Sequence, residues 1–167
     1  MSKAIFCRNE HDSLKRLAVC KPQYMTIRDV INETQRVYIN ENIDVRKALK
    51  QHDQFCEVLR KNGIELVELP AYQEYPEQVF TRDIGFTIGS TVFISELRHQ
   101  IRKGEKKFLK AWLQQHQLAF QELTASIEGG DVVLDGGTVF VGISQRTSEA
   151  AVQELSDLLN GYTIKML

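Results

Sequence analysis

The 167-residue chain has no long apolar run, little net charge and few cysteines. No stretch is long and apolar enough to cross a bilayer, and the polar start, Met1 to Asp12, lacks the apolar run of a signal peptide. A net charge of -1 gives no indication of binding to nucleic acid or to an anionic membrane surface. The 3 cysteines are not closely spaced, which is typical of free thiols in a reducing cytosol, so we expect a cytoplasmic protein.

The length predicts one domain over 1–167, because a chain of this size can bury about 70% of its unfolded surface in one core. No low-complexity stretch or linker divides the sequence. The segment Tyr24 to Asn42 is the least patterned, and we expect a mobile loop covering a pocket there.

An internal repeat organises the chain. Gly89-Ser90-Thr91-Val92-Phe93 and Gly136-Gly137-Thr138-Val139-Phe140 are nearly the same pentapeptide, 47 positions apart. Each lies between two short apolar stretches, which predicts two hairpins with tight glycine turns. Each hairpin leads to a helical pattern and then to a further strand, Leu118 to Leu123 in the first copy and Tyr162 to Met166 in the second.

The two predicted helices each have an apolar face. Ser148 fits the N-cap of the second helix, and Asn160-Gly161 fits its C-cap. The apolar faces consist of Phe108, Ala111 and Trp112 in the first helix, and of Ala151, Val152, Leu155, Leu158 and Leu159 in the second.

The N-terminal third follows the same plan loosely. Leu14 to Cys20 predicts a strand, Asn62-Gly63 predicts the end of a helix, and Ile64 to Leu69 predicts another strand. The apolar stripe of the helix between them consists of Val45, Ala48, Leu49, His52, Phe55, Cys56 and Leu59. The chain is therefore predicted to contain about three strand–strand–helix–strand repeats, a pattern typical of a propeller or array in which each repeat needs neighbours to bury its faces.

Two acidic clusters, Phe80-Thr81-Arg82-Asp83 and Glu128-Gly129-Gly130-Asp131, place carboxylates in tight backbone settings. A planar guanidinium pairs bidentately with carboxylate oxygens, so these clusters are candidate guanidinium-binding groups. Either cluster alone also fits an ordinary surface feature, an ion pair at a strand end or a turn. Because both clusters occur in one chain and at the repeat spacing, we favour the interpretation that they form a guanidinium-binding site.

Four stretches of the chain resemble the guanidine-modifying, or pentein, superfamily, in particular its dimethylarginine dimethylaminohydrolase and arginine deiminase branch. In the order and spacing of the family they are Tyr75 to Asp83, Ile101 to Glu105, Glu128 to Asp131 and Gly142 to Thr147. The family fold is a pseudo-symmetric α/β propeller of five ββαβ modules. The resemblance therefore implies an α/β fold, an incomplete propeller with about three of five modules, in a single, C-terminally truncated domain over 1–167.

The resemblance also implies roles for individual acids. Asp83 is implied to grip the substrate guanidinium, Glu128 to orient a catalytic histidine, and Phe80 to form a pocket wall. Glu77 stands where the family usually has a shorter Asn or Asp. Because Glu reaches one methylene further, the choice of guanidine substrate stays open at this position.

Two arginines are implied to hold the other end of the substrate. Arg102 and Arg146 correspond to the family's arginines for the α-carboxylate, with which they would form charge-assisted pairs. Without the resemblance, Arg102 fits equally well a solvated helix start, and Arg146 an ordinary surface arginine.

The groups for covalent chemistry fall outside the matching stretches. In the family a cysteine thiolate attacks the guanidinium carbon and a histidine is the general acid and base, and both family positions come after Leu167. Cys7, Cys20 and Cys56 match neither position. His52 and Cys56 could face each other on one helix, but no further ligands accompany them, so we expect core packing, no metal and no cofactor.

Two functions of different classes remain open. The first is the N-terminal fragment of an amidine hydrolase acting on arginine-type guanidines such as arginine or methylated arginine, from a split or decayed enzyme and inactive alone. The second is a non-catalytic binding or interaction module on a pentein scaffold. Open module flanks predict pairing with a complementary C-terminal fragment or self-association, and we expect no nucleic-acid or membrane partner.

Overall fold

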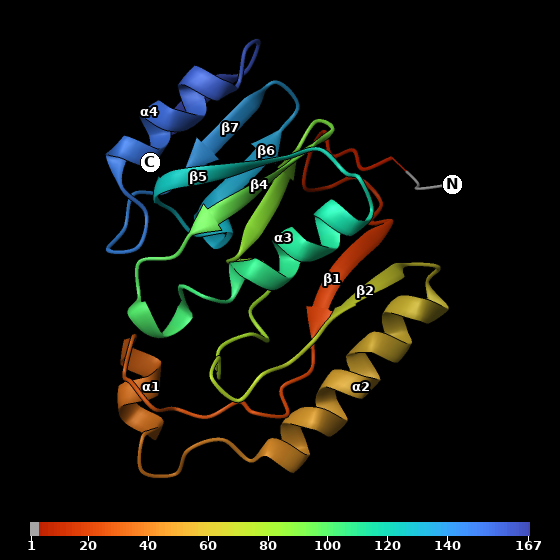
Figure 1. The fold of residues 1–167 in the computed structure, drawn as a ribbon, viewed down its shortest axis with the longest axis vertical. Coiled ribbons are helices and arrows are strands. Elements are labelled where there is room, and N and C mark those ends of the chain that lie inside the picture. The colour runs from red at the N-terminus through yellow and green to blue at the C-terminus, as the bar shows by residue number, and fades with distance from the viewer. Residues whose placement is uncertain (1–3) are drawn as a thin grey trace. The chain divides into compact units, whose positions relative to one another are not determined.

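The computed structural model describes residues 4–167, which divide into two compact units. The first unit comprises residues 4–12 and Arg82–Leu167, and the second unit comprises Ser13–Thr81. Each combines helices with β-sheet, so the predicted α/β class is confirmed (Figure 1). Throughout the described part of the chain, every helix is too short or too polar to cross a membrane.

The second unit is built on a strand–helix–strand arrangement. β1 (Arg16–Cys20) and β2 (Glu65–Leu69) pair in parallel, which requires a crossover connection. The helix α2 (Val45–Lys61) lies in that connection, and its C-cap Asn62 is followed by Gly63 with φ +74°. Glycine tolerates this left-handed conformation at a helix end. The two strands, the helix and the position where the helix ends are as predicted.

The second unit departs from the sequence prediction in three respects. Its sheet has the order β1-β2, so this region is strand–helix–strand and not a third strand–strand–helix–strand repeat. The segment expected to be a loop contains α1 (Glu33–Tyr38), which begins where the Asn32 side chain accepts the Gln35 N–H. Of the predicted apolar stripe on α2, Cys56 is buried and Phe55 is half exposed.

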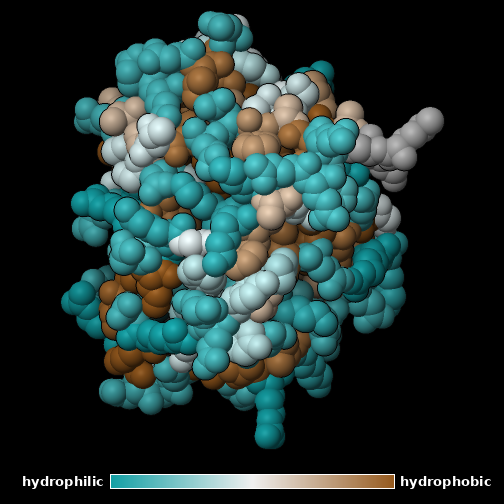
Figure 2. Space-filling model, viewed as in Figure 1, coloured by the Kyte–Doolittle hydropathy of each residue, from teal (hydrophilic) through white to brown (hydrophobic). Residues whose placement is uncertain are grey.

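Exposed apolar side chains of this kind are scattered over the molecule. Phe55 and Val58 of α2 and Val37 of α1 all reach the solvent. Figure 2 shows separate hydrophobic areas on a visible surface that is mostly hydrophilic. Single exposed apolar residues are normal in folded proteins, so only a patch with further support indicates an interface.

Two three-stranded sheets form the first unit. The first sheet consists, in order, of β3 (Gly85–Ile88), β4 (Thr91–Glu96) and β5 (Phe120–Ser126). The second consists, in order, of β6 (Val132–Asp135), β7 (Thr138–Val141) and β8 (Thr163–Met166). In each sheet the first two strands are antiparallel and the third joins the second in parallel. The predicted repeat is therefore present twice in this unit.

A helix makes the parallel connection in each repeat. α3 (Lys106–Gln115) joins β4 to β5, and α4 (Glu149–Leu158) joins β7 to β8. Ser148 caps α4 as predicted, because its hydroxyl accepts the Ala151 N–H. The C-cap is Leu159, which is earlier than the predicted Asn160-Gly161 because the last α-helical bond is Leu159 N–H to Leu155.

Both hairpins turn on glycine. The loops Gly89-Ser90 and Gly136-Gly137 each join their strands through two residues, and the first glycine of each has a positive φ, +56° and +57°. A positive φ at this position is the requirement of two-residue hairpin turns, and glycine meets it without strain. The predicted turns are confirmed.

The core of the first unit lies between its two sheets. The alternation of side chains directs one face of each sheet inward, and α4 closes the space between them. The buried cluster consists of Phe86, Ile88, Phe93, Leu123, Ile127, Val132, Leu134, Val139, Val141, Ala151, Leu155 and Leu159. This pair of repeats carries the side chains described next.

Candidate functional site

Both predicted acidic clusters lie immediately before the first strand of a repeat. Asp83 precedes β3, and Glu128 precedes the short 3-10 helix η2 (Gly129–Asp131) that leads into β6. The Gly129 N–H donates to the Asp83 carbonyl at 3.2 Å. A Cβ on Gly129 would overlap the Arg82 carbonyl oxygen, so only glycine allows the two clusters to approach this closely.

Arg82 adds a second connection between the clusters. Its Nε donates to the Gly129 carbonyl at 2.9 Å, and its Nη2 donates to the Val132 carbonyl at 2.5 Å. Nη2 also lies 3.0 Å from the Glu10 carboxylate. The sequence interpretation gave Arg82 no role, although its position beside Asp83 was the signal that could have indicated one.

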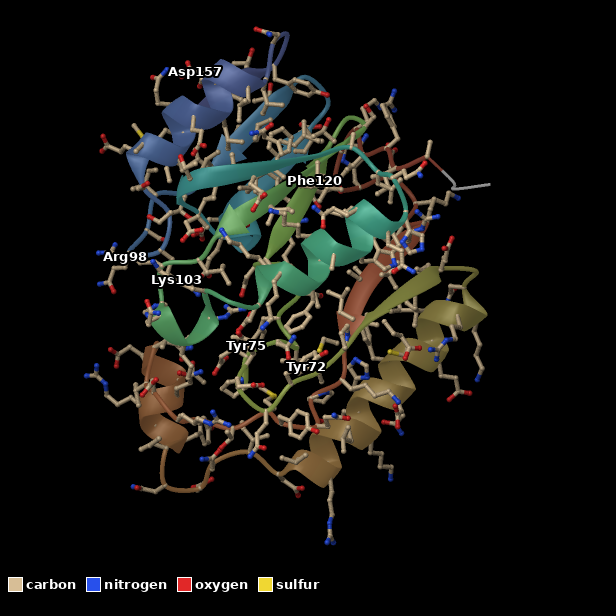
Figure 3. All side chains as sticks on the ribbon, viewed as in Figure 1. Tyr72, Tyr75, Arg98, Lys103, Phe120 and Asp157 are labelled. Carbon is tan, nitrogen blue, oxygen red and sulfur yellow. The ribbon has the colours of Figure 1, made fainter. Side chains whose placement is uncertain are left out.

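Arg102 is one of the buried charged groups of the site. It ends the 3-10 helix η1 (Gln100–Arg102), and its Nη1 donates to Asp83 Oδ2 at 2.8 Å. Its Nε and Nη2 donate to Glu105 at 3.1 and 2.9 Å. By contrast Arg98 and Lys103, labelled in Figure 3, are exposed on the same segment.

The neighbouring acids stabilise the positive charge of Arg102. Burial acts to lower its pKa, but hydrogen bonds and charges from Glu105 and then Asp83 outweigh burial and raise the pKa above the ordinary value. A buried cation is tolerated only with such partners. Glu105 is itself buried and was missed as a site residue, although its i,i+3 spacing from Arg102 could have indicated the pair.

Glu128 is buried and incompletely paired. Its Oε2 lies 3.0 Å from Arg146 Nη1. Its Oε1 has no hydrogen-bond partner among the described residues, and Arg102 Nη1 lies 4.0 Å from it. Burial and then the Asp83 charge raise the pKa of Glu128, although Arg146 and Arg102 act to lower it. An incoming N–H donor at Oε1 would relieve an unsatisfied acceptor.

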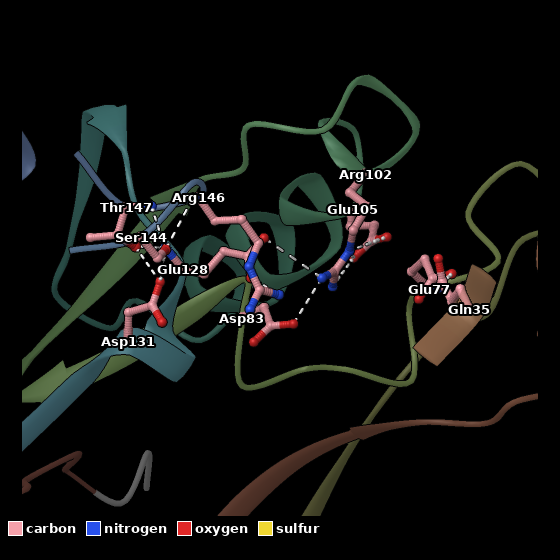
Figure 4. Close-up of polar contacts among 10 residues, drawn as sticks. All are labelled: Gln35, Glu77, Asp83, Arg102, Glu105, Glu128, Asp131, Ser144, Arg146 and Thr147. Atoms are coloured by element: carbon pink, nitrogen blue, oxygen red, sulfur yellow. Dashed lines mark hydrogen bonds and ion pairs between the residues drawn. The ribbon is translucent and has the colours of Figure 1, made fainter. Parts of the chain in front are cut away.

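Asp131 fixes the loop that carries Arg146 (Figure 4). Its Oδ2 accepts the Ser144 hydroxyl at 2.9 Å and the Thr147 hydroxyl at 2.6 Å. The Ser144 oxygen in turn accepts the Arg146 backbone N–H at 3.0 Å, and Thr147 Oγ1 accepts the Glu128 backbone N–H at 3.1 Å. One hydrogen-bonded network therefore sets the backbone of both partners of the Glu128–Arg146 pair.

The two remaining predicted site residues belong to the second unit. Glu77 is buried, and its Oε1 accepts the Gln35 side-chain N–H at 2.8 Å, so it contacts α1. Phe80 is partly exposed. The predicted residues that meet in one network of the first unit are Asp83, Arg102, Glu128 and Arg146.

The thiols of Cys7 and Cys56 have environments that disfavour the thiolate. Cys7, Cys20 and Cys56 are free cysteines, and burial raises the pKa of Cys7 and of Cys56, which disfavours the reactive thiolate. Cys56 Sγ lies 3.6 Å from His52 Nδ1. Within residues 4–167 no three metal-binding side chains gather in one place.

Comparison with known proteins gives the same family for most of the chain. The family model described as "N,N dimethylarginine dimethylhydrolase, eukaryotic" matches residues 21–166. The uncharacterized protein YkgA of Bacillus subtilis is 46% identical over 95% of this chain and 56% of its own length. The N(G),N(G)-dimethylarginine dimethylaminohydrolase of Pseudomonas aeruginosa is 24% identical over 71% of this chain and 48% of its own length.

A solved structure shares the fold. The N-terminal domain of ArgZ, an arginine dihydrolase from the Ornithine-Ammonia Cycle in Cyanobacteria, aligns with a TM-score of 0.81 at 23% identity. The alignment covers 93% of this chain and 57% of that chain. The described residues therefore form a mixed α/β structure similar to pentein domains. The chain spans about half the length of the curated relatives it matches.

Proposed function

The chain belongs to the N,N dimethylarginine dimethylhydrolase family, within the pentein superfamily, and on that premise we propose that it is the substrate-binding part of an amidine hydrolase acting on arginine-type guanidines. The observation that carries the proposal is the joining of two acid–arginine pairs, Asp83–Arg102 and Glu128–Arg146, at the open ends of two hairpins. A substrate with a cationic guanidinium and an anionic carboxylate needs both kinds of group.

Asp83 is the proposed acceptor for the substrate guanidinium. Arg102 holds its Oδ2, and Oδ1 faces Gly130, where a Cβ would stand 3.0 Å away. Glycine at this position keeps space beside Oδ1. A guanidinium lying there would form a charge-assisted pair with a carboxylate whose orientation is already fixed.

Glu128 is the proposed positioning group for a catalytic histidine. Its buried Oε1 has no donor among the described residues, so the structure leaves an acceptor for an imidazole N–H. A carboxylate in that relation holds the imidazole in one tautomer and one orientation, as in other acid–base catalysts. The histidine would come from outside these 167 residues.

The two arginines differ in what they can offer a substrate. Arg146 is partly exposed and is the proposed partner of the substrate α-carboxylate. Arg102 is buried between Asp83 and Glu105, so a direct contact with the carboxylate would require it to exchange one of these partners. We propose that Arg102 acts mainly by orienting Asp83.

Glu77 and Phe80 keep their proposed roles as a second acid and a pocket wall. Glu77 is already oriented by Gln35, which supports a fixed position for its carboxylate. Its side chain is one methylene longer than that of Asp, so its carboxylate reaches further from the backbone. Substrate choice among arginine and methylated arginines is proposed to depend on this length.

The nucleophile is proposed to lie in a further part of the enzyme. The raised pKa of Cys7 and of Cys56 and the burial of Cys20 support this, because none favours a thiolate at neutral pH. The same observation also favours the second candidate, a binding module without catalysis, for these residues taken alone. The free cysteines support a reducing, cytoplasmic location.

The proposal includes an incomplete propeller, with about three of five modules in one domain over 1–167. The two strand–strand–helix–strand repeats support two of these modules, and the strand–helix–strand unit, which has one strand fewer, is proposed as an incomplete third. A complementary C-terminal fragment, or self-association, would complete the assembly. The coverage of 56% of YkgA is consistent with a partial ring.

Binding of L-arginine to the chain, measured by isothermal titration calorimetry, tests the proposed site. Asp83→Asn keeps the shape of the side chain and removes its charge. We expect its Kd to be at least about tenfold weaker, or ~1.4 kcal/mol, since hydrogen bonds to charged groups contribute about 1.5–3 kcal/mol.

Asp135→Asn is the matched control, because Asp135 is exposed at the end of β6. Its Kd should equal that of the unmodified chain. Thermal unfolding of both variants separates lost binding from lost structure. Binding that Asp83→Asn leaves unchanged would refute the guanidinium assignment.

A further inference from the structure

Asp131 stands in the second repeat where Ile84 stands in the first. The two residues are 47 positions apart, and each immediately precedes the first strand of its repeat. The Ser95 N–H donates to the Ile84 carbonyl at 3.0 Å, and the Gly142 N–H donates to the Asp131 carbonyl at 2.8 Å. Ser95 and Gly142 are also 47 positions apart, so both repeats form the same backbone contact.

The side chains at these two positions differ in kind. Ile84 is apolar and 3% exposed, so it contributes to packing. Asp131 carries a carboxylate that accepts hydrogen bonds from Ser144 and Thr147. Because the first repeat makes the same backbone contact with an apolar side chain, the fold of a repeat does not require a carboxylate at this position. The hydrogen-bond partners of Asp131 therefore indicate its role.

The hydroxyl of Ser144 uses its full hydrogen-bonding capacity. It donates to Asp131 Oδ2 at 2.9 Å, and it accepts the backbone N–H groups of Arg146 at 3.0 Å and of Thr147 at 3.1 Å (Figure 4). A serine hydroxyl has one donor and two acceptor lone pairs, so its orientation is fixed once all three are engaged. Asp131 therefore holds the backbone at Arg146 through one hydroxyl.

The hydroxyl of Thr147 forms a second branch from the same carboxylate oxygen. It donates to Asp131 Oδ2 at 2.6 Å and accepts the Glu128 backbone N–H at 3.1 Å. Thr147 is 1% exposed, and a buried N–H that loses its acceptor costs the full desolvation penalty of that group. One oxygen thus accepts both hydroxyls, and the charge of Asp131 strengthens both bonds.

We propose that Asp131 is a positioning residue for the Glu128–Arg146 pair. Through Ser144 it fixes the backbone of Arg146, the proposed partner of the substrate carboxylate. Through Thr147 it fixes the backbone of Glu128, the proposed holder of the catalytic histidine. These two roles are those of the proposed function, on which the inference rests. Both groups need a fixed position, because a misplacement of about 1 Å can cost about a hundredfold in rate.

Amide hydrogen exchange, measured by NMR, tests the positioning without any ligand. Ser144→Ala removes the acceptor of the Arg146 N–H, which should exchange about fivefold faster while the Glu128 N–H keeps its rate. Thr147→Val removes the acceptor of the Glu128 N–H and should give the reverse pattern. Asp131→Ala removes the acceptor that both hydroxyls share, so both amides should exchange faster.

Conservative variants and a reference amide make the test specific. Thr147→Ser and Asp131→Asn each keep an oxygen acceptor, so both should retain the slow exchange that Thr147→Val and Asp131→Ala lose. Asp135→Asn, at an exposed acid of the same repeat, should leave the exchange of Glu128 and Arg146 unchanged. The Val92 N–H of β4, which donates to the Ala119 carbonyl at 3.1 Å, should keep its exchange rate in every variant.

The affinities of two ligands show whether the positioning affects recognition. By isothermal titration calorimetry, Ser144→Ala should weaken the binding of L-arginine about fivefold and leave that of agmatine, which lacks the carboxylate, unchanged. An unmodified chain that binds neither ligand would refute the proposed function. The exchange pattern would then still decide whether Asp131 positions the pair, so the two ideas can fail separately.

Three results would overturn the proposal. Unchanged exchange at Glu128 and Arg146 in Asp131→Ala would show that the carboxylate does not hold them. Equal acceleration at Val92 would show a general loss of structure. Equal weakening of L-arginine and agmatine by Ser144→Ala would show that this hydroxyl does not position the partner of the substrate carboxylate.

Discussion

The two repeats of the first unit each contribute one acid–arginine pair, but they bury opposite members of it. In the first repeat Arg102 is 2% exposed and Asp83 is 18% exposed, at a distance of 2.8 Å. In the second repeat Glu128 is 2% exposed and Arg146 is 40% exposed, at 3.0 Å. The repeated topology places the two pairs alike, and the surroundings decide which charge is removed from water.

The difference in burial has consequences for what each pair can do. Arg102 has a second acid, Glu105, and so its buried charge is compensated. Glu128 has no second donor of comparable distance, and Oε1 is left without a hydrogen bond in the described structure. A satisfied buried ion stabilises one conformation, whereas an unsatisfied buried acceptor is available to a ligand or a catalytic partner. Arg102 is therefore expected to act mainly on structure, whereas Glu128 retains an acceptor that a ligand or a catalytic partner can use.

The largest effect on the free energy of unfolding is expected at the buried Arg102. Arg102→Gln leaves Asp83 and Glu105 without their cation, and breaking a buried ion pair costs about 3–5 kcal/mol of the free energy of unfolding. Urea unfolding measures this loss. Arg98→Gln, at an exposed arginine of the same segment, should change stability by less than about 0.5 kcal/mol. Equal losses in the two variants would contradict the assignment of Arg102 as the structural member.

An intermediate effect on stability is expected from the titration of Glu128. Its pKa is raised in the folded chain by burial and by Asp83, so the folded state retains the proton when the unfolded chain has already lost it. Stability from this group is present below the ordinary carboxyl pKa and is lost as pH rises through the raised value.

Glu128→Gln cannot titrate, so its stability relative to the unmodified chain should increase as pH rises through that window. Thermal unfolding across a pH series measures the difference. Glu74→Gln, at an exposed glutamate of the second unit, provides the control and should show no such trend. A stability difference for Glu128→Gln that does not change with pH would show that Glu128 is not the unsatisfied acid of the comparison.

The smallest effect on stability is expected at the exposed arginine. Arg146→Gln should cost about 1–2 kcal/mol, less than Arg102→Gln, because it leaves one buried carboxylate without its partner and Arg146 itself is partly solvated. Its effect should appear instead in ligand binding: L-arginine should bind about tenfold more weakly, as expected for one charge-assisted hydrogen bond. Agmatine, which lacks the carboxylate, should bind with unchanged affinity. Equal weakening for both ligands would argue against a carboxylate contact.

Local elements of the first unit could be read from the sequence because short-range chemistry decides them. The Gly89 and Gly136 turns need a positive φ, and Ser148 supplies a hydroxyl to a free N–H at a helix start. These requirements involve neighbours in the chain. The same reasoning failed for the N-terminal third, where the expected third strand of the sheet depends on partners distant in sequence.

The sequence indicated four charged residues that meet in the fold, but it did not indicate how they pair. Asp83, Arg102, Glu128 and Arg146 could be selected from motifs, but the assignment of acids and arginines to opposite ends of a substrate gave no indication that they also pair with each other. Glu105, Arg82 and Asp131 were missed as positioning residues. Their roles come from hydrogen bonds to backbone and side chains that become neighbours only in the folded chain.

The sequence by itself determined the repeat, its glycine turns, the helix start at Ser148 and the charged residue types of the candidate site, because each follows from local geometry or from the charge of a side chain. Only the tertiary structure decided which charges are buried, which oxygen of Glu128 lacks a donor, and why Phe86 is covered while Val133 is open. The physical reason is that burial and electrostatic compensation depend on all neighbours in space. Two nearly identical segments therefore acquire different roles once one has a packed neighbour and the other does not.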